Sequence, residues 1–417
     1  MSFINELESY IFTGNKTLCT GCGACAQICK HSALKMMPDE EGFLYPKINS
    51  ENCVECGLCN SICPVTGPNK ENEDYDTHCF VATTSYKNYY KDSASIGICT
   101  MLSESIIKQN GYVFGAYLDE TSWTAYHILI NSDIGIQKIR NSKYLQSTTK
   151  GTFIQARKLL IEGSIVLYIG TPCQIAGLKS FLRKDYPNLY TIDLICHGVF
   201  SPRLMPLEIG YWENKFKGKV TNFKFRSKKV YKNVNGGMVN FDLQRDGGIR
   251  HIERFAASSP TYRCYAYSGD GNHYNHRLSC YSCHFRSQKR YGDLTVGDPW
   301  FIVNGALHSK ILSSSNPVRS LYSVNSEKGE RLIGAIRNNL IVEEISQLDA
   351  FRQPALLASK NVVPEKRRDL FSLIGSMEYG KAVEKLLDCN LEDAHKSFVC
   401  SYRKDEIKRM IKKLLFK

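Results

Sequence analysis

Two short runs of cysteine with the same internal spacing constrain this chain more than any other feature. The first run has the pattern Cys-x2-Cys-x2-Cys-x3-Cys from Cys19 to Cys29, and the second repeats it from Cys53 to Cys63. The runs start 34 residues apart, which indicates an internal duplication. Eight of the 17 cysteines lie in this stretch, and so regular a repeat indicates ligands of a bound metal centre.

The spacing is typical of bacterial-type ferredoxins with two [4Fe-4S] clusters, in which the fourth cysteine of each run binds the cluster of the other run. We therefore predict two such clusters. The first group of ligands is Cys19, Cys22, Cys25 and Cys63, and the second group is Cys53, Cys56, Cys59 and Cys29. Gly21, Gly23 and Gly57 suit the tight loops that such a site needs, whereas Lys30 stands where the pattern usually has proline.

A pair of zinc sites is the alternative for the same eight cysteines. Zinc sites usually combine two separated cysteine pairs, not a triplet and a single cysteine repeated twice. The spacing therefore favours iron–sulfur clusters.

Length and composition describe an ordinary globular protein of two or three domains. The chain has 417 residues, of which 43% are hydrophobic and 23% are charged. It has no apolar run of membrane-spanning length, and its first residues do not resemble a signal peptide. We therefore predict a soluble cytoplasmic protein, in which many cysteines are ligands because the cytoplasm disfavours disulfides. No nucleic-acid-binding motif is present, and we predict no such partner.

Charge separates the cysteine-rich region from the rest of the chain. Residues 1–76 carry five Lys and Arg against eleven Asp and Glu, while the whole chain has a net charge of +13. The polar segment 69–77 reads as a linker. We predict a ferredoxin-like domain at 1–77, a larger domain at 78–340 and a helical region at 341–417. The opposite charges favour docking of the first two domains, although both can equally be ordinary solvated surfaces.

The middle of the chain has the pattern of an α/β domain. We expect helix 96–109 with Ser95 as its N-cap, strands 112–117 and 125–130, helix 155–162, strand 164–169, helix 172–182 and strand 190–196. The last three elements form a βαβ unit, so part of the sheet should be parallel. The turn after Gly170 is not a P-loop, and no G-x-G-x-x-G motif occurs.

Four further cysteines follow expected strands or lie in a loop. This third group is Cys173, Cys196, Cys280 and Cys283. A Cys-x-x-Cys pair with two dispersed cysteines is suited to a third [4Fe-4S] cluster, and Cys173 stands at the start of a helix, which favours a thiolate. Buried free thiols are an equally good interpretation from the spacing alone.

Several long strings in one order resemble the family of coenzyme F420 hydrogenase/dehydrogenase β-subunits. They are residues 111–116, 142–147, 170–178, 193–199, 225–228, 277–283 and 293–298. The resemblance covers about residues 80–330. The family includes β-subunits of F420-reducing hydrogenase and formate dehydrogenase, the F420H2-oxidising part of a sulfite reductase, and proteins of bacterial polysaccharide loci.

The resemblance implies a mixed-sheet α/β domain that binds FAD and has its own [4Fe-4S] cluster, with the third group as its ligands. The flavin-site residues that it implies are Ser95, Gly97, Ser142, Lys143, Gln146, Thr171, Gln174 and Arg226. Cys264 is a spare ligand candidate, and we interpret the remaining cysteines as structural. Ile96 and the segment Pro299-Trp300-Phe301 depart from the family pattern, so the family's substrate does not transfer to this chain.

Together these features predict an iron–sulfur flavoprotein oxidoreductase. A flavin converts between the single electrons of iron–sulfur clusters and the hydride of an organic molecule. That molecule is F420 or another organic substrate, with polysaccharide biosynthesis as one setting. His197 and Asp298 are candidate proton donors, although a single histidine is more often structural. The alternative is a non-catalytic subunit that relays electrons to a redox partner protein, which would be a ferredoxin or another component of a hydrogenase or dehydrogenase.

The C-terminal segment has the pattern of a basic amphipathic helix. Its apolar positions are Ile407, Met410, Ile411, Leu414 and Leu415. Such a helix either packs against the body of the protein or lies on a membrane surface, and the sequence leaves both open.

Overall fold

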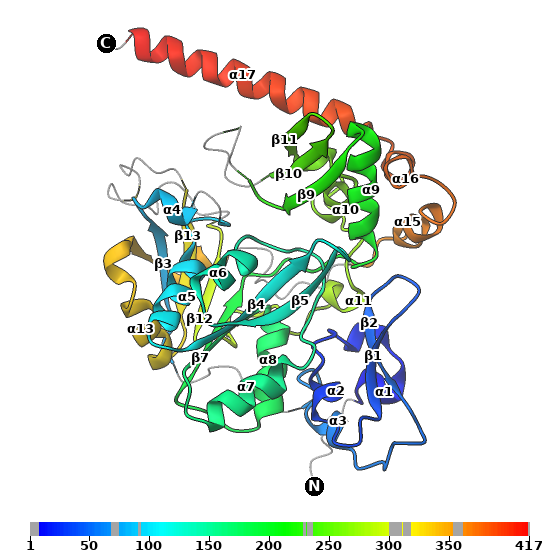
Figure 1. The fold of residues 1–417 in the computed structure, drawn as a ribbon, viewed down its shortest axis with the longest axis vertical. Helices are drawn as coiled ribbons and strands as arrows, with labels where there is room; N and C mark the ends of the chain where they lie inside the picture. The colour runs from blue at the N-terminus through cyan, green and yellow to red at the C-terminus, as the bar shows by residue number, and fades with distance from the viewer. Residues whose placement is uncertain are drawn as a thin grey trace. The chain divides into compact units, whose positions relative to one another are not determined.

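The computed structural model describes residues 8–67, 75–90, 93–227, 231, 237–299, 311, 318–352 and 362–415 (Figure 1). The chain divides into two compact units, each made of two separate stretches of sequence. The first unit contains Met1–Pro202 and Arg277–Val362, and the second contains Arg203–His276 and Val363–Lys417. The domain boundaries expected from the sequence stay a prediction, and the linker expected at 69–77 lies mostly outside the described residues.

The cysteine-rich region, residues 8–67 of the first unit, is built from short elements. They are α1 (Tyr10–Thr13), η1 (Lys16–Leu18), α2 (Ala24–Ile28), β1 (Leu34–Pro38), β2 (Leu44–Ile48) and α3 (Leu58–Ser61). The two strands form an antiparallel hairpin in which Leu34 lies opposite Ile48. The helices α2 and α3 each follow a cysteine loop, and Gly23 and Gly57 at their starts have φ values of 78° and 70°, which non-glycine residues rarely adopt.

A mixed sheet of nine strands, counted within the described residues, forms the centre of the first unit. In spatial order the strands are β14 (Ile341–Ile345), β3 (His78–Thr83), β13 (Ser320–Val324), β12 (Leu294–Gly297), β8 (Leu189–Leu194), β7 (Val166–Gly170), β4 (Tyr112–Asp119), β5 (Thr124–Ile130) and β6 (Ser147–Thr148). The central strands β12, β8, β7 and β4 are parallel. The expected mixed α/β fold and its β7–α8–β8 unit are therefore confirmed.

Helices cover both faces of this sheet. Those of the first unit are α4 (Lys87–Tyr90), α5 (Ile98–Lys108), α6 (Asp133–Ile139), α7 (Thr152–Ile161), α8 (Pro172–Leu182), α11 (Leu278–Tyr281), α13 (Glu327–Gly334), η4 (Arg337–Asn339) and α14 (Gln347–Ala350). Neighbouring residues of a strand point to opposite faces. Tyr168 of β7 thus packs in one core with α7 and α8, and Leu167 packs in the other with α5.

The cysteine-rich region shares the core that contains α7 and α8. Ala24 and Ile28 of α2 and Ile62 are buried in the same cluster as Phe153 and Leu178. Figure 1 shows α2 next to α8. The ferredoxin-like region is thus packed on one face of the sheet and not merely tethered to it.

The start of α5 differs from the sequence prediction. The N-cap is Gly97 and not Ser95, and the helix begins at Ile98 and not at Ile96. Ser95 and Gly97 both have positive φ, at 44° and 84°, so the chain makes a left-handed turn where the pattern predicted the first helical turn.

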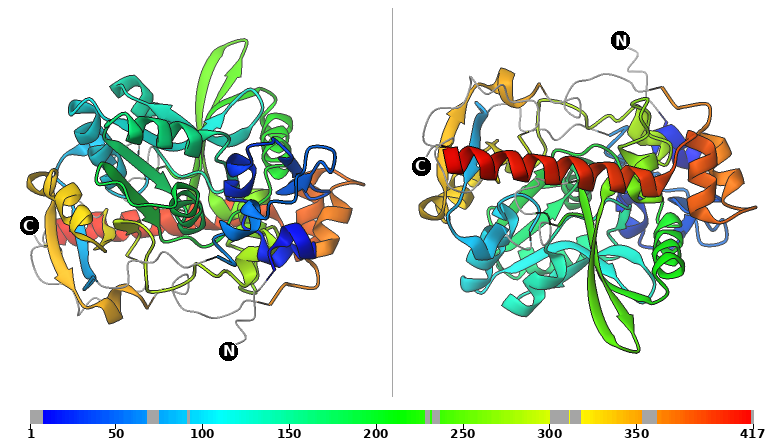
Figure 2. Two further views of the ribbon diagram at one scale, coloured as in Figure 1. Left: turned by 90° about the horizontal axis from the view of Figure 1, so that it is seen from below. Right: turned by 90° about the horizontal axis from the view of Figure 1, so that it is seen from above.

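The second unit combines an antiparallel sheet with helices. Its elements are α9 (Leu204–Phe216), β9 (Lys219–Lys224), β10 (Met238–Arg245), β11 (Gly248–Phe255), η2 (Ala256–Ser258), α10 (Pro260–Tyr265), α15 (Arg367–Leu373), α16 (Tyr379–Leu387) and α17 (Leu391–Leu415). Trp212 and Phe241 pack in its interior. Figure 2 shows β10 and β11 as a long twisted ribbon.

The C-terminal residues are mostly helical, with one difference from the prediction. Ile341–Ile345 forms β14, an edge strand that pairs with β3, so the expected helical region begins with a strand. Phe398 of the last helix stacks on Phe255, and the two ring centroids are 4.6 Å apart. Side chains from 409 onward, which include most of the expected apolar stripe, lie outside the described residues. Within the described part of the chain, no helix has the length and apolarity needed to span a membrane.

Candidate functional site

The structure brings together the four thiols of the first group. Burial raises the pKa of Cys22 to about 12, with contributions from the neighbouring Cys63 and Cys19. The pKa of Cys25 is raised by burial and by the charges of the other thiols around it. All four thiols line one hollow of about 390 Å³. The fourth cysteine of the second run therefore crosses to the first run, as the ferredoxin spacing predicts.

The thiols of the second group lie at the surface. Burial raises the pKa of Cys59, and the charges of Cys56 and Cys29 add to the effect, so these three thiols are neighbours. Cys56 is exposed and Cys53 is half-buried, and the Val54 side chain between them is 58% exposed. The loop that carries two of these thiols thus faces solvent.

The third group gathers from three separate segments of the chain. Cys173 lies in the first turn of α8, Cys196 follows β8, and Cys280 and Cys283 lie in and just after α11. Burial raises the pKa of Cys280 to about 12 and that of Cys196 to about 11, with further contributions from the Cys283 charge. All four thiols line a second hollow, of about 550 Å³.

The two hollows are suited to a group larger than one metal ion. In the part of the chain that is described, no three His, Cys, Asp or Glu side chains converge closely enough to hold a single ion. Instead, four thiols surround each hollow. Arg286 and Arg290 also line the third group's hollow, and their charges oppose the raised pKa of Cys283. Four thiols beside cations fit an anionic cluster.

Helix α8 connects the first and third groups. Cys173 lies in its first turn, and Gly177 one turn later faces the first group. A methyl group at position 177 would lie 2.9 Å from both Cβ and Sγ of Cys22. Glycine is therefore required there for the close approach of the loop. In addition, Thr149 Oγ1 donates a hydrogen bond to the carbonyl of Cys22 at 2.6 Å.

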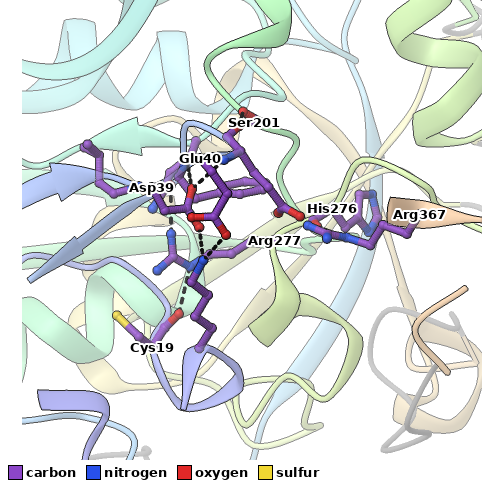
Figure 3. Close-up of polar contacts among 12 residues, drawn as sticks. Cys19, Asp39, Glu40, Ser201, His276, Arg277 and Arg367 are labelled. Carbon is purple, nitrogen blue, oxygen red and sulfur yellow. Dashed lines mark hydrogen bonds and ion pairs between the residues drawn. The ribbon is translucent and has the colours of Figure 1, made fainter. Parts of the chain in front are cut away.

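Arg277 reaches the first group from just before α11 (Figure 3). Its Nε donates to the carbonyl of Cys19 at 2.7 Å, and its Nη1 donates to Oε1 of Gln146 at 3.0 Å. The side chain is fully buried. No cluster spacing indicates this residue, and the only sequence signal is its position three residues before Cys280.

A buried ion pair fixes the segment that follows the third group. Arg290 Nη2 lies 2.9 Å from Oδ1 of Asp193, and both side chains are almost completely buried. The other carboxylate oxygen, Asp193 Oδ2, accepts from the N–H groups of Tyr291 and Gly292 at 3.1 and 3.0 Å. Asp193 belongs to β8, so this network ties the segment to the centre of the sheet. Sequence reasoning did not identify this pair.

Several candidate flavin and catalytic residues follow the carboxyl ends of the parallel strands. Thr171 follows β7, His197 comes shortly after β8, and Asp298 follows β12. Asp298 accepts a hydrogen bond from the hydroxyl of Ser95, and Gly97 is the N-cap of α5. In α/β proteins, ligands commonly bind at this edge of the sheet. The arrangement suits a cofactor site there.

The 142–146 segment and the start of α8 lie at the same edge. The backbone of Gln146 pairs with that of Phe200, which follows β8. Gln174 Oε1 accepts from the N–H of Thr171 at 3.0 Å, and its Nε2 donates to the carbonyl of Ser147 at 2.9 Å. These bonds order the turn between β7 and α8.

Lys143 and Ser142 have local partners, and Arg226 lies in the other unit. Lys143 Nζ donates to the carbonyls of Arg140 at 2.7 Å and Asn141 at 3.2 Å. Burial lowers the pKa of Lys143 to about 7. The N–H of Ser142 donates to Oδ1 of Asn141 at 2.8 Å. Arg226 is buried after β9 of the second unit. These residues stay predictions as flavin ligands.

Two protein families match separate parts of the chain. Residues 163–348 match the family described as the C terminus of the coenzyme F420 hydrogenase/dehydrogenase beta subunit. Residues 18–66 match the 4Fe-4S dicluster domain. The second match contains all eight cysteines of the two runs, and the first contains the whole third group.

Two curated relatives have names that refer to coenzyme F420. A coenzyme F420-dependent sulfite reductase of Methanocaldococcus jannaschii is 25% identical over 252 residues, 54% of this chain and 38% of the relative. One of the subunits of the F(420)H(2) dehydrogenase of Methanosarcina mazei is 22% identical over 205 residues, 45% of this chain and 57% of the relative. The chain thus spans less than two thirds of either relative's length.

A solved structure of the F420-reducing [NiFe] hydrogenase complex from Methanosarcina barkeri is more distantly similar. It has 14% sequence identity and a TM-score of 0.39, and the match covers 76% of this chain and 90% of that one.

Proposed function

We propose that this chain is an iron–sulfur flavoprotein oxidoreductase. The proposal rests on two family matches. Residues 163–348 match the coenzyme F420 hydrogenase/dehydrogenase beta subunits, and residues 18–66 match the 4Fe-4S dicluster family. It exchanges electrons between ferredoxin-type clusters and a flavin. The observation that carries the proposal is the placement of the first and third groups of thiols within one unit, joined by α8 and by Arg277.

The three groups of cysteines are proposed as the ligands of three [4Fe-4S] clusters. When bound, such clusters supply one-electron transfer. The first and third groups are supported by shared hollows lined by four thiols each. The second group is supported by the proximity of Cys29, Cys56 and Cys59. The chain's own part is to hold the thiols and to exclude water from the first and third groups.

The flavin is proposed to bind at the carboxyl edge of the parallel strands. When bound, FAD supplies exchange between hydride and single electrons. Thr171, Gln174 and Ser95 are placed at this edge and would hold the cofactor, while Asp298, hydrogen-bonded to Ser95, can hold a proton beside it. His197 is the second candidate for holding a proton, because it directly follows Cys196 at the same edge.

The organic redox partner is proposed to be F420 or another hydride donor or acceptor. The names of both curated relatives refer to coenzyme F420, which favours that choice. Polysaccharide biosynthesis is the proposed setting for a different substrate. The departures at Ile96 and Pro299 lie close in sequence to Ser95 and Asp298, so they are the positions where the site would differ from its relatives.

Anaerobic reconstitution followed by an optical titration tests this function. The full chain, loaded with iron, sulfide and FAD, is titrated separately with F420H2, reduced ferredoxin and NADH. We expect bleaching of both the flavin band and the iron–sulfur absorbance with at least one donor. Asp298→Asn should retain iron and FAD but slow flavin reduction by the organic donor. A chain that binds clusters but no flavin would contradict the proposal.

A non-catalytic electron-transfer subunit is the second candidate. It is favoured because one relative is named as a subunit. The exposed loop with Cys56 is a suitable place for a partner protein to deliver or accept electrons. Turnover of F420H2 with an artificial acceptor by the isolated chain would favour the enzyme, whereas cluster reduction without any such turnover would favour the non-catalytic role.

A further inference from the structure

A buried arginine without a carboxylate partner lies against the first group. Arg277 is 0% exposed, and within the described residues it has no ion-pair partner. Its Nη2 is buried and has no hydrogen-bond acceptor among the residues that the structure describes. An uncompensated buried charge costs several kcal/mol, so a fold that retains one normally supplies an anion.

The surroundings of the guanidinium point to the first group's hollow as the place of that anion. The group stacks on the Tyr45 ring at 4.0 Å from its centroid. A methyl group at Gly21, between two of the thiols, would lie 3.1 Å from Cζ and Nη1 of Arg277. The positive charge is therefore directed at the cysteine loop.

The backbone of the same residue is bonded to the third group's segment. The carbonyl of Arg277 accepts from the N–H of Cys280 at 2.9 Å, while its side chain donates to the carbonyl of Cys19. One residue thus joins a ligand loop of the first group to a ligand helix of the third.

We propose that Arg277 is the counter-cation of a cluster held by the first group and raises the reduction potential of that cluster. Reduction adds a negative charge, which burial disfavours and a nearby fixed cation favours. Net charge and hydrogen bonding are known controls of cluster potential. Arg277 acts as a positioning residue, since it holds the Cys19 loop and sets the local potential without binding iron. The inference rests on the proposed iron–sulfur function.

An EPR-monitored redox titration of the reconstituted full chain tests the inference. Two neutral variants, Arg277→Met and Arg277→Gln, should shift the potential of the first group's cluster to more negative values. The second group's cluster should keep its potential and serves as the internal reference. Arg277→Lys should keep part of the wild-type potential, because it keeps the charge but loses the planar fork.

Lys16→Met is the matched control, because it removes a cation of the same region that is paired with Asp39 and Glu40. This control should shift the potential of the first group's cluster less than the two neutral Arg277 variants do, because Lys16 is partly exposed.

The outcomes separate this inference from the proposed function. Unchanged potentials in both neutral variants, with full iron content, would overturn the role of Arg277 while leaving the clusters in place. Equal shifts of all clusters would also overturn it, because they would indicate a global change of structure. If one neutral variant fails to bind iron, the other and Arg277→Lys still give the potential. A wild-type chain that takes up no iron would instead contradict the proposed function.

Discussion

The first and second groups of cysteines have identical spacing in the sequence but different environments in the structure, since Cys22 of the first group is buried and Cys56 of the second is exposed. The first group is packed against α8, where Gly177 permits contact with Cys22, and it is covered by Arg277. Two thiols of the second group, Cys53 and Cys56, lie in a loop in which Cys56 and Val54 are exposed. We propose that the two copies of this motif have different roles. The exposed copy is suited to exchange electrons with a partner, and the buried copy is suited to pass them to the third group.

The largest expected effects come from replacing one ligand in each copy. Three four-iron clusters correspond to about twelve irons per chain, so Cys22→Ser and Cys56→Ser should each lose about four. Cys22→Ser should also lower the free energy of unfolding more, because its thiol is packed in the core shared with α8. Iron analysis and denaturant unfolding measure both effects. Equal destabilisation by the two variants would remove the distinction between the copies.

Asp193→Asn tests how much the buried ion pair between Asp193 and Arg290 contributes to the free energy of unfolding. The substitution leaves Arg290 buried without its carboxylate, which should cost about 3–5 kcal/mol of unfolding free energy. Urea unfolding of the reconstituted protein measures the loss. A change below about 1 kcal/mol would show that the pair is not required to hold the segment after Cys283.

His127 should make the free energy of unfolding depend on pH. Burial lowers its pKa from 6.5 to about 4, and the Lys143 charge contributes. Between these two pKa values, the unfolded chain binds more protons than the folded chain does. The free energy of unfolding therefore falls as the pH is lowered. From pH 7.5 to 5.5 the loss should be about 1.4 kcal/mol. Urea midpoints at both pH values measure it.

The control for this pH dependence is His127→Gln. The variant lacks the titrating ring, so the difference in unfolding free energy between pH 7.5 and 5.5 should shrink. The same difference in variant and wild type would assign the effect to other groups.

The smallest effect is expected at the exposed ion pair of the cysteine-rich region. Glu40 lies 2.7 Å from Lys16 Nζ, but its side chain is 77% exposed. Glu40→Gln should change the free energy of unfolding by about 0–1 kcal/mol, because water screens the pair. Differential scanning calorimetry is the check. A loss comparable to that of Asp193→Asn would contradict the contrast between surface and interior.

The sequence predicts the local elements well where local signals are strong. Helix α8 has the predicted bounds because Thr171 and Pro172 define its start, and strands β4 and β5 pair as their alternation indicates. The predicted start of α5 was wrong because positive φ at Ser95 and Gly97 is not visible in the apolar pattern. The cysteine spacing predicted that Cys63 joins the first run; the structure places Cys63 near Cys22, and its role as a ligand stays a prediction.

The contacts that assemble the site could not be predicted in this way. Arg277 and Cys19 are 258 residues apart, and Thr149 and Cys22 are 127 apart. A single sequence contains no periodic pattern or local spacing that joins such distant residues. Gln146 shows the consequence. The resemblance implies a flavin ligand, whereas in the structure its side chain accepts from Arg277 beside the first group.

The order in which electrons reach the first and second groups is tested most directly by freeze-quench EPR. The reconstituted chain is mixed with reduced ferredoxin and frozen at successive times. In the wild type, we predict that the signal of the second group appears first and that of the third group last. In Cys22→Ser, the second group should still be reduced while the third stays oxidised. Reduction of the third group at the same rate in both proteins would contradict the central claim that the buried copy connects the surface to the interior site.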